Sequence, residues 1–338
     1  MKNKNYSQGF SLIELLVAMV VGLIIISGAF SLHSATRKVQ RVNEAQMDMS
    51  ADARFAIETI AYDLRHSGMW GSTNRDGLID CKSTDTLCTV STSTGDTPPS
   101  TVTDDCAVAG APVWSYDLTQ AVFATDDTAG NPYGSTCIPP AEGYLSGTDV
   151  LEVKYADSNS SGAALIDGQM YVRSNFINGR LFVGSTAPRL NASDSSTITS
   201  NYMLRAYTYY ISNFTDTAGD GIPSLRRAAL VNGPAVENQL LISGVVDLQV
   251  QFGEDLDDVV DIAGNLSIDA YVDPNQVTDW TKVYAAKIWL VMRGDTQQGV
   301  TSVKQFAIAG KPAASYGSDG FRYFMVTSVV NLRNLKQL

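Results

Sequence analysis

Residues 15–32 read LLVAMVVGLIIISGAFSL, a run of eighteen positions without a charged side chain. A helix needs about 20 apolar residues to cross the hydrocarbon core of a bilayer, which is about 30 Å thick. The run therefore predicts a membrane-spanning helix. It differs from a secretory signal peptide, because the polar leader MKNKNYSQG ends at Gly9, before the apolar run begins.

Glu14 lies at the edge of this apolar run, five residues after Gly9. A carboxylate at the centre of a membrane helix costs about 2.5–3.5 kcal/mol, and somewhat less near the interface. Two interpretations stay open. Either Glu14 lies among the lipid headgroups at a helix N-terminus, where the helix dipole favours it, or a buried cation pairs with it.

The string GFSLIE at 9–14 resembles the processing site of type IV prepilins, in which a short charged leader ends in Gly and is followed by Phe and a Glu at the fifth mature position. The resemblance implies cleavage after Gly9 by an inner-membrane prepilin peptidase and N-methylation of the new terminus at Phe10. It also implies that the helix leaves the membrane for a filament, where Glu14 meets the amino terminus of a neighbouring subunit and sets the helix register.

Basic residues flank the apolar run on both sides. Lys2 and Lys4 precede it, and Arg37, Lys38 and Arg41 follow it closely. The positive-inside rule therefore does not decide the orientation. A periplasmic C-terminal domain is what the prepilin resemblance implies.

The helical pattern continues beyond the membrane run. Apolar residues recur at three- and four-residue spacing on one helix face: Ala53, Ala56, Ile57, Ile60, Ala61 and Leu64. The sequence predicts one helix over 10–66, with about 10–32 in the membrane, which ends at Ser67-Gly68.

The composition excludes several classes of function. The chain has 24 Lys and Arg against 35 Asp and Glu, a formal net charge of −11, which argues against direct binding to nucleic acid phosphates. His33 and His66 are its only two histidines, so the commonest metal ligand and general base is scarce. The sequence contains no P-loop, dinucleotide-binding fingerprint, HExxH or GxSxG motif. We therefore expect no enzymatic activity.

Residues 67–112 form a Ser-, Thr- and Gly-rich region that we expect to be loop. Four cysteines occur in the chain, and their even number suits disulfides in an oxidising compartment: Cys81, Cys88, Cys106 and Cys137. Three pairings are possible, of which we favour Cys81–Cys88 with Cys106–Cys137. Zinc is the alternative, but no paired CxxC is present.

Residues 113–338 are expected to form a β-rich periplasmic globular domain. Alternating or apolar runs predict strands such as 148–156, 169–176, 202–212, 245–253, 283–293 and 321–332. In 245–253, apolar side chains alternate with Asp247, Gln249 and Gln251, which is typical of a half-buried strand. The predicted fold class is α+β, a long N-terminal helix packed on a mainly antiparallel β-sheet domain, as in type IV pilins.

Weaker motifs extend the resemblance along the chain. Residues 54–58, 63–68, 221–227 and 330–334 look like PilW-type minor pilins of type IV pilus systems. This resemblance implies an inner-membrane, single-pass precursor that joins other minor pilins and the major pilin at the assembly platform. It would prime or cap the pilus and support twitching motility, attachment or DNA uptake.

Two other functions stay open. The ending VNLRN at 330–334 also occurs in J-type minor pseudopilins of type II secretion systems. Alternatively, the large domain is a binding module at the pilus tip that attaches to a surface or carries a large adhesin.

Acidic loops are the remaining candidates for chemistry, and none has the spacing of an EF-hand. The best calcium site among them is the loop 216–221, with Asp216 and Asp220. We otherwise expect solvated turns and no cofactor.

Overall fold

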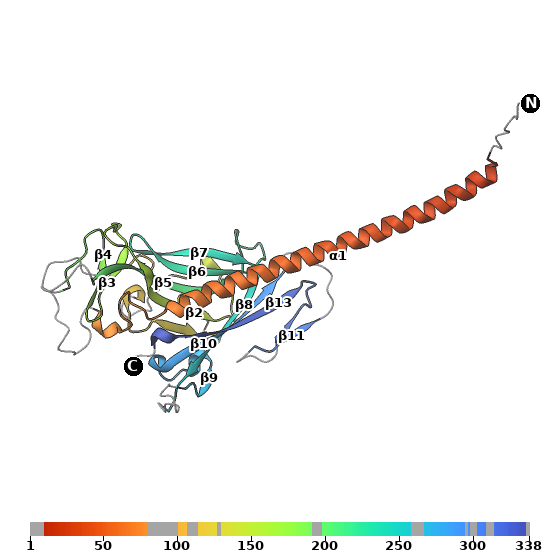
Figure 1. Cartoon of the computed structure of the whole chain (residues 1–338). Coiled ribbons are helices and arrows are strands. Elements are labelled where there is room, and N and C mark those ends of the chain that lie inside the picture. Colours follow the sequence, from red (N-terminus) through yellow and green to blue (C-terminus); the bar gives the residue numbers. More distant parts are fainter. Residues whose placement is uncertain are drawn as a thin grey trace, which may run out of the picture. The chain divides into compact units, whose positions relative to one another are not determined.

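The computed structural model describes residues 10–79, 101–106, 114–126, 130–190, 198–257, 267–294, 297, 303–308 and 314–335. Gly9, the leader 1–9, Cys81 and Cys88 lie outside the described residues. The chain divides into two compact units, Met1–Ser50 and Ala51–Leu338, which we describe separately (Figure 1).

The helix α1 runs from Leu12 to His66 and has 55 residues. At 1.5 Å per residue it is about 80 Å long. In the first unit its large apolar side chains are exposed, from Leu12 to Leu32. The helix is long and apolar enough to cross a membrane, and none of its most apolar stretch is buried within the described part of the chain.

In the second unit, residues 51–66 of α1 bury one face. The buried apolar side chains are those that the sequence placed there: Ala53, Ala56, Ile57, Ile60, Ala61 and Leu64. The helix ends at His66, and Gly68 follows with a positive φ of 75°. The Gly68 amide donates a hydrogen bond to the Lys154 carbonyl at 3.1 Å, which ties the end of the helix to the sheet.

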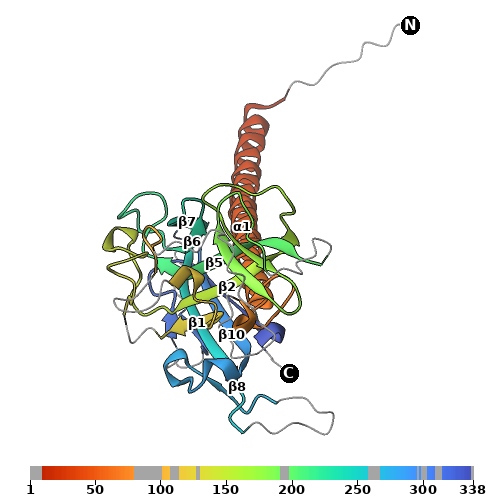
Figure 2. The ribbon, with the colours of Figure 1, turned by 90° about the vertical axis from the view of Figure 1, so that its left-hand side faces the viewer.

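The largest sheet described in the second unit is antiparallel and has seven strands. Its strands are β1 (Val122–Thr125), β2 (Val150–Ser160), β3 (Met170–Ser174), β4 (Gly179–Val183), β5 (Ser200–Ser212), β6 (Ser224–Val231) and β7 (Ala235–Ser243). Figure 2 shows β1, β2, β5, β6 and β7 of this sheet. The strands follow the order β1-β2-β5-β3-β4, while β6 pairs with β5 and β7 pairs with β6. The long strand β5 can therefore pair with three neighbours.

A second antiparallel sheet has the order β13-β10-β8-β9. Its strands are β8 (Val245–Glu254), β9 (Ala270–Val272), β10 (Val283–Arg293) and β13 (Tyr323–Asn331), and a separate hairpin pairs β11 (Lys304–Phe306) with β12 (Ala314–Tyr316). Short 3₁₀ helices occur at Asp76–Leu78, Trp114–Tyr116, Pro140–Glu142, Pro274–Gln276, Trp280–Lys282 and Arg333–Leu335. The fold is α+β, as predicted.

The strand β8 differs from its prediction in one respect. The apolar face is buried as expected, with Leu248 and Phe252 at 0% exposure, but Asp247 and Gln249 on the polar face are buried too. The Tyr316 hydroxyl from β12 donates to Asp247 Oδ2 at 2.8 Å, and Gln249 Nε2 donates to Asp247 Oδ1 at 2.9 Å. The polar face is buried because other chain segments cover it and satisfy its hydrogen bonds.

Candidate functional site

The first described residues are those of the predicted processing segment. Phe10 lies before the helix, and its side chain is 88% exposed. Exposed, non-helical chain is the preferred substrate of proteases. The first residue after the predicted cleavage position is therefore exposed and non-helical, and cleavage after Gly9 stays a prediction.

Ser11 and Glu14 form a capping box at the start of α1. The Ser11 backbone N–H donates to Glu14 Oε2 at 2.9 Å, and the Glu14 backbone N–H donates to Ser11 Oγ at 3.3 Å. This reciprocal pair satisfies two of the amide groups that a helix N-terminus leaves without partners. It also explains why the helix begins at Leu12 and not at Phe10.

The capping box bears on the two interpretations of Glu14. Within this chain the carboxylate lies at the N-terminus of its own helix, where the helix dipole favours it. Contact with a neighbouring subunit stays a prediction. The Ser-x-x-Glu pattern at 11–14 is the sequence signal of this capping box.

A buried carboxylate joins the second half of α1 to the seven-stranded sheet. Asp63 is only 4% exposed. Its two oxygens accept hydrogen bonds from the hydroxyls of Tyr155 on β2, at 2.6 Å, and Tyr209 on β5. Burial raises the pKa of Asp63, and the two tyrosine hydrogen bonds oppose that rise. The Asp63 contact fixes the rotation of the helix on the sheet.

The C-terminal segment holds the same end of α1. Asn334 Nδ2 donates to the Arg65 carbonyl, and Asn74 Nδ2 donates to the Asn334 carbonyl, both at 3.1 Å. Gly68 has a positive φ of 75°, which favours glycine, and a Cβ atom there would also lie 2.5 Å from Leu335 Cδ2. Gly68, Asn74 and Leu335 also line a cleft of about 460 Å³.

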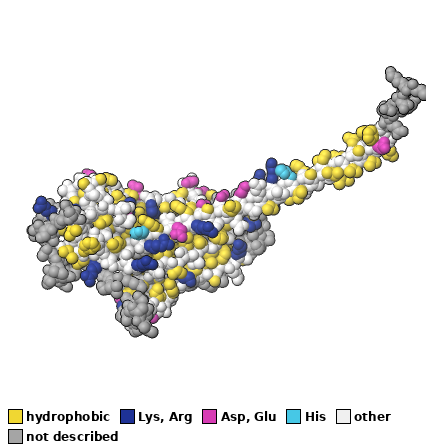
Figure 3. Space-filling model, viewed as in Figure 1, with side chains coloured by type: hydrophobic (Ala, Val, Ile, Leu, Met, Phe, Trp, Pro, Cys, Tyr) yellow, Lys and Arg dark blue, Asp and Glu magenta, His cyan; other side chains and the backbone are white. Residues whose placement is uncertain are grey.

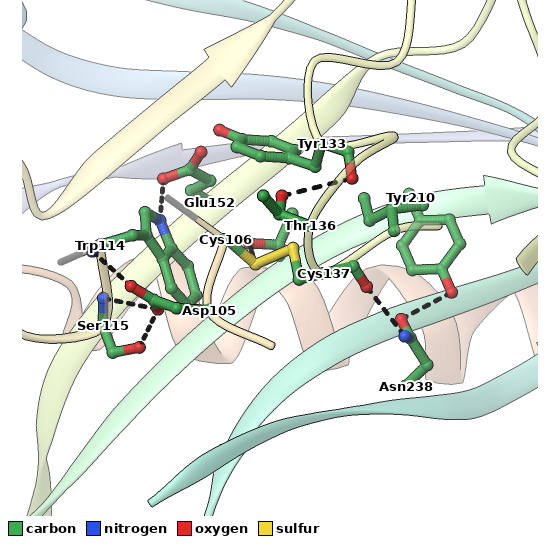
Figure 4. Close-up of a disulfide and its surroundings, with 12 residues drawn as sticks. Asp105, Cys106, Trp114, Ser115, Tyr133, Thr136, Cys137, Glu152, Tyr210 and Asn238 are labelled. Atoms are coloured by element: carbon green, nitrogen blue, oxygen red, sulfur yellow. Dashed lines mark hydrogen bonds between the residues drawn. A yellow bond between two sulfur atoms is a disulfide. The ribbon is translucent and has the colours of Figure 1, made fainter. Parts of the chain in front are cut away.

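The predicted Cys106–Cys137 disulfide is present (Figure 4). Both cysteines are 1% exposed, and 31 positions separate them in the sequence. The neighbouring Asp105 carboxylate accepts hydrogen bonds from the backbone amides of Trp114, at 2.9 Å, and Ser115, at 3.2 Å. The disulfide and Asp105 together hold this segment on the sheet.

Glu152 on β2 lies close to the disulfide segment (Figure 4) and is 3% exposed. Its Oε2 accepts a hydrogen bond from the indole N–H of Trp114, and the Lys154 ammonium lies 5.0 Å from the Trp114 ring centroid. Burial raises the pKa of Glu152 to about 7, although the charge of Lys154 and the indole hydrogen bond favour the ionised form. Glu152 is therefore a buried acid that titrates near neutral pH.

In the predicted calcium loop, 216–221, the Asp220 carboxylate binds backbone amides of the loop and its flanks. The Asp220 carboxylate accepts hydrogen bonds from the backbone amides of Ile222, at 2.9 Å, and Thr215, at 3.0 Å. These amide hydrogen bonds hold the pKa of Asp220 well below its usual range, and the bond from Ile222 has the largest effect. Asp220 oxygens thus face the amides of their own loop, and calcium binding at Asp216 and Asp220 stays a prediction.

A second acidic cluster lies beyond β8. Asp255, Asp257 and Asp269 each place a carboxylate oxygen within 4.8 Å of the others. Carboxylate oxygens are the ligands that calcium prefers. The Leu256 amide donates to Asp269 Oδ2 at 2.8 Å, so one of these oxygens also organises the local backbone.

Two parts of the chain, one near each end, match known protein families. Residues 4–30 match the prokaryotic N-terminal methylation motif, and residues 208–334 match the family of the type IV pilus-assembly protein W. These matches confirm the resemblance drawn from the processing string and from the C-terminal motifs. The second match includes the C-terminal segment that holds the end of α1.

A solved structure of a type IV-like pilin from Thermus thermophilus is 14% identical to this chain. The similarity covers 57% of this chain and 82% of that chain, with a TM-score of 0.28. No curated protein matches the chain.

Proposed function

We propose, on the premise that the chain joins a pilin methylation motif to a type IV pilus-assembly segment, that it is a minor pilin. In this proposal the precursor is inserted in the inner membrane through residues 10–32, cleaved after Gly9 and N-methylated at Phe10. It then joins other minor pilins and the major pilin in a complex that primes or caps the pilus.

The observation that carries the proposal is the form of the N-terminal segment. Phe10 precedes the helix and is exposed, and α1 begins directly behind it with an apolar surface that no described residue covers. Such a surface needs either lipid or other apolar helices around it. A pilin passes from the first environment to the second.

Glu14 has a specific part in this transfer. A carboxylate that moves from the membrane interface into a bundle of helices needs a cationic partner, because an unpaired buried charge is costly. The terminal ammonium at Phe10 of a neighbouring subunit supplies that cation. Glu14 would exchange its hydrogen bond to the Ser11 amide for this ion pair, and the pair would set the axial offset between subunits.

The location follows from the same proposal. The domain lies in the periplasm before assembly and at the cell surface, on the pilus, afterwards. The Cys106–Cys137 disulfide supports an oxidising compartment. Motility, attachment and DNA uptake are the downstream processes that such a pilus serves.

The test compares strains that lack the gene with strains that carry the wild-type or the Glu14→Ala chain. Pili are counted by electron microscopy, and secreted exoenzymes are assayed in parallel. We expect lost pili and intact secretion without the gene. Glu14→Ala should leave membrane insertion unchanged but reduce pili strongly, whereas the matched control Glu58→Ala, an exposed carboxylate on the same helix, should restore them.

Other outcomes would assign the chain elsewhere. Normal pili with blocked secretion would make it a minor pseudopilin of a type II secretion system. Normal pili, normal secretion and failed attachment would favour the binding module at the tip. Normal assembly with Glu14→Ala would refute the role of Glu14 in helix register.

A further inference from the structure

A group of basic side chains on α1 follows the apolar run, and we call Arg37, Lys38 and Arg41 the basic stripe. We propose that the basic stripe binds the phosphates of anionic phospholipids at the membrane surface that the helix leaves. This inference rests on the proposed function, because it requires residues 10–32 to span the membrane.

The helix places the three side chains on one side. Arg37 and Arg41 are four residues apart and therefore adjacent on the helix surface, and Lys38 is about 100° round the axis from Arg37. All three are exposed. The nearby Glu44 accepts a hydrogen bond from Gln40 Nε2 at 3.0 Å.

The backbone of the stripe lies just beyond the headgroup layer, within reach of long side chains that extend back toward it. The apolar run ends at Leu32, which puts Arg37 about 7.5 Å and Arg41 about 13.5 Å beyond it at 1.5 Å per residue. The headgroup layer on each side of a bilayer is about 5–7 Å thick. Figure 3 shows this succession on α1, with hydrophobic side chains first and basic side chains after them.

The direction of the side chains brings them closer to the lipid. Side chains of an α-helix tilt toward its N-terminus. In α1 the apolar run lies on the N-terminal side of the stripe, so Arg37, Lys38 and Arg41 lean back toward the membrane. Their aliphatic stems can lie along the helix while the charged groups reach the phosphates.

The basic stripe has the opposite charge to the chain as a whole. The whole chain has a formal net charge of −11, so an anionic membrane surface repels most of it. Cleavage after Gly9 would remove Lys2 and Lys4 and leave the stripe as the basic flank of the span. The stripe would then hold the processed subunit at an anionic membrane until assembly withdraws it.

The test measures which lipid contacts the protein. The full chain is reconstituted in phosphatidylcholine bilayers with a trace of spin-labelled phosphatidylglycerol or spin-labelled phosphatidylcholine. The fraction of label with restricted motion gives the preference of the protein for the anionic lipid. We compare the wild type, the variant R37Q/K38Q/R41Q, and a control with Arg54→Gln, an exposed arginine further along α1.

We expect the wild type to prefer phosphatidylglycerol by about fivefold for each basic residue that contacts it. This preference should fall in 0.5 M salt, because salt screens exposed charges. The triple variant should lose the part of the preference that the stripe supplies, whereas Arg54→Gln should behave as the wild type does. Lys2 and Lys4, where the leader is retained, contribute equally to every variant and cancel in the comparison.

Equal preference in the wild type and the triple variant would overturn the proposal. If that triple variant also failed to make pili, the stripe would instead contact an acidic partner subunit. Glu14→Ala separates this inference from the proposed function. That variant should keep the lipid preference of the wild type even though it fails to assemble, and a failure of the lipid test would leave the Glu14 result unaffected.

Discussion

Glu152→Gln tests whether a buried acid makes the stability of the second unit depend on pH. In the folded chain burial raises the pKa of Glu152 to about 7, from an ordinary value of 4.5. Between these two pH values the unfolded chain releases the proton while the folded chain keeps it. The stabilisation from this group is therefore fully present below pH 4.5 and is lost as the pH rises through 7.

The size of the effect follows from the two pKa values. One pKa unit corresponds to 1.36 kcal/mol, so a pKa of about 7 against 4.5 corresponds to about 3 kcal/mol. Glutamine has nearly the same shape and keeps an oxygen that can accept the Trp114 indole N–H. It carries no titrating proton. The difference in unfolding free energy between Glu152→Gln and wild type should therefore shift by about 3 kcal/mol in favour of the variant between pH 4.5 and pH 8.

The assay is urea unfolding of residues 51–338, followed by tryptophan fluorescence, at several pH values for both proteins. Taking the difference between variant and wild type removes the contribution of all other titrating groups. Glu58→Gln, which alters an exposed carboxylate paired with Arg65, is the control for the replacement of a surface carboxylate. If the difference for Glu152→Gln stays constant to within about 0.5 kcal/mol, the reasoning is wrong.

Two further predictions concern stability. Asp63→Ala should lower the unfolding free energy of the second unit by about 3 kcal/mol, because it leaves the buried hydroxyls of Tyr155 and Tyr209 without their charged acceptor. Urea unfolding measures this, and a loss no larger than that of Glu58→Ala would contradict it. Replacing Cys106 and Cys137 together by Ser should lower the free energy of unfolding by about 4 kcal/mol. The reason is that the disulfide closes a loop between cysteines 31 positions apart, which reduces the conformational entropy of the unfolded chain. Thermal unfolding with and without reductant checks it, and equal melting temperatures for the double variant and the oxidised wild type would argue against a stabilising disulfide.

Local patterns were enough to predict much of this protein. The apolar run 15–32 and the spacing of Ala53, Ile57 and Ile60 depend on neighbours within a few helical turns, and the helix appeared where that periodicity placed it. The strands β2, β3, β5, β8, β10 and β13 overlap the runs predicted from alternation or apolar content. The GFSLIE string at 9–14 identified the N-terminal segment, which matches the methylation motif.

Features that join distant parts of the chain needed the tertiary structure. The Asp63 hydrogen bonds to Tyr155 and Tyr209 span 92 and 146 positions, and no sequence period links such residues. Burial of Asp247 likewise depends on Tyr316 from a separate hairpin, 69 positions away.

The amino-acid sequence by itself therefore determined the α+β class, the membrane-type helix and the processing string, because each is a property of consecutive residues. The tertiary structure decided the strand order, the raised pKa of Glu152 and the contact that fixes α1 on its sheet. Those features depend on which polar groups meet after the chain has excluded water, and only the packed chain brings them together.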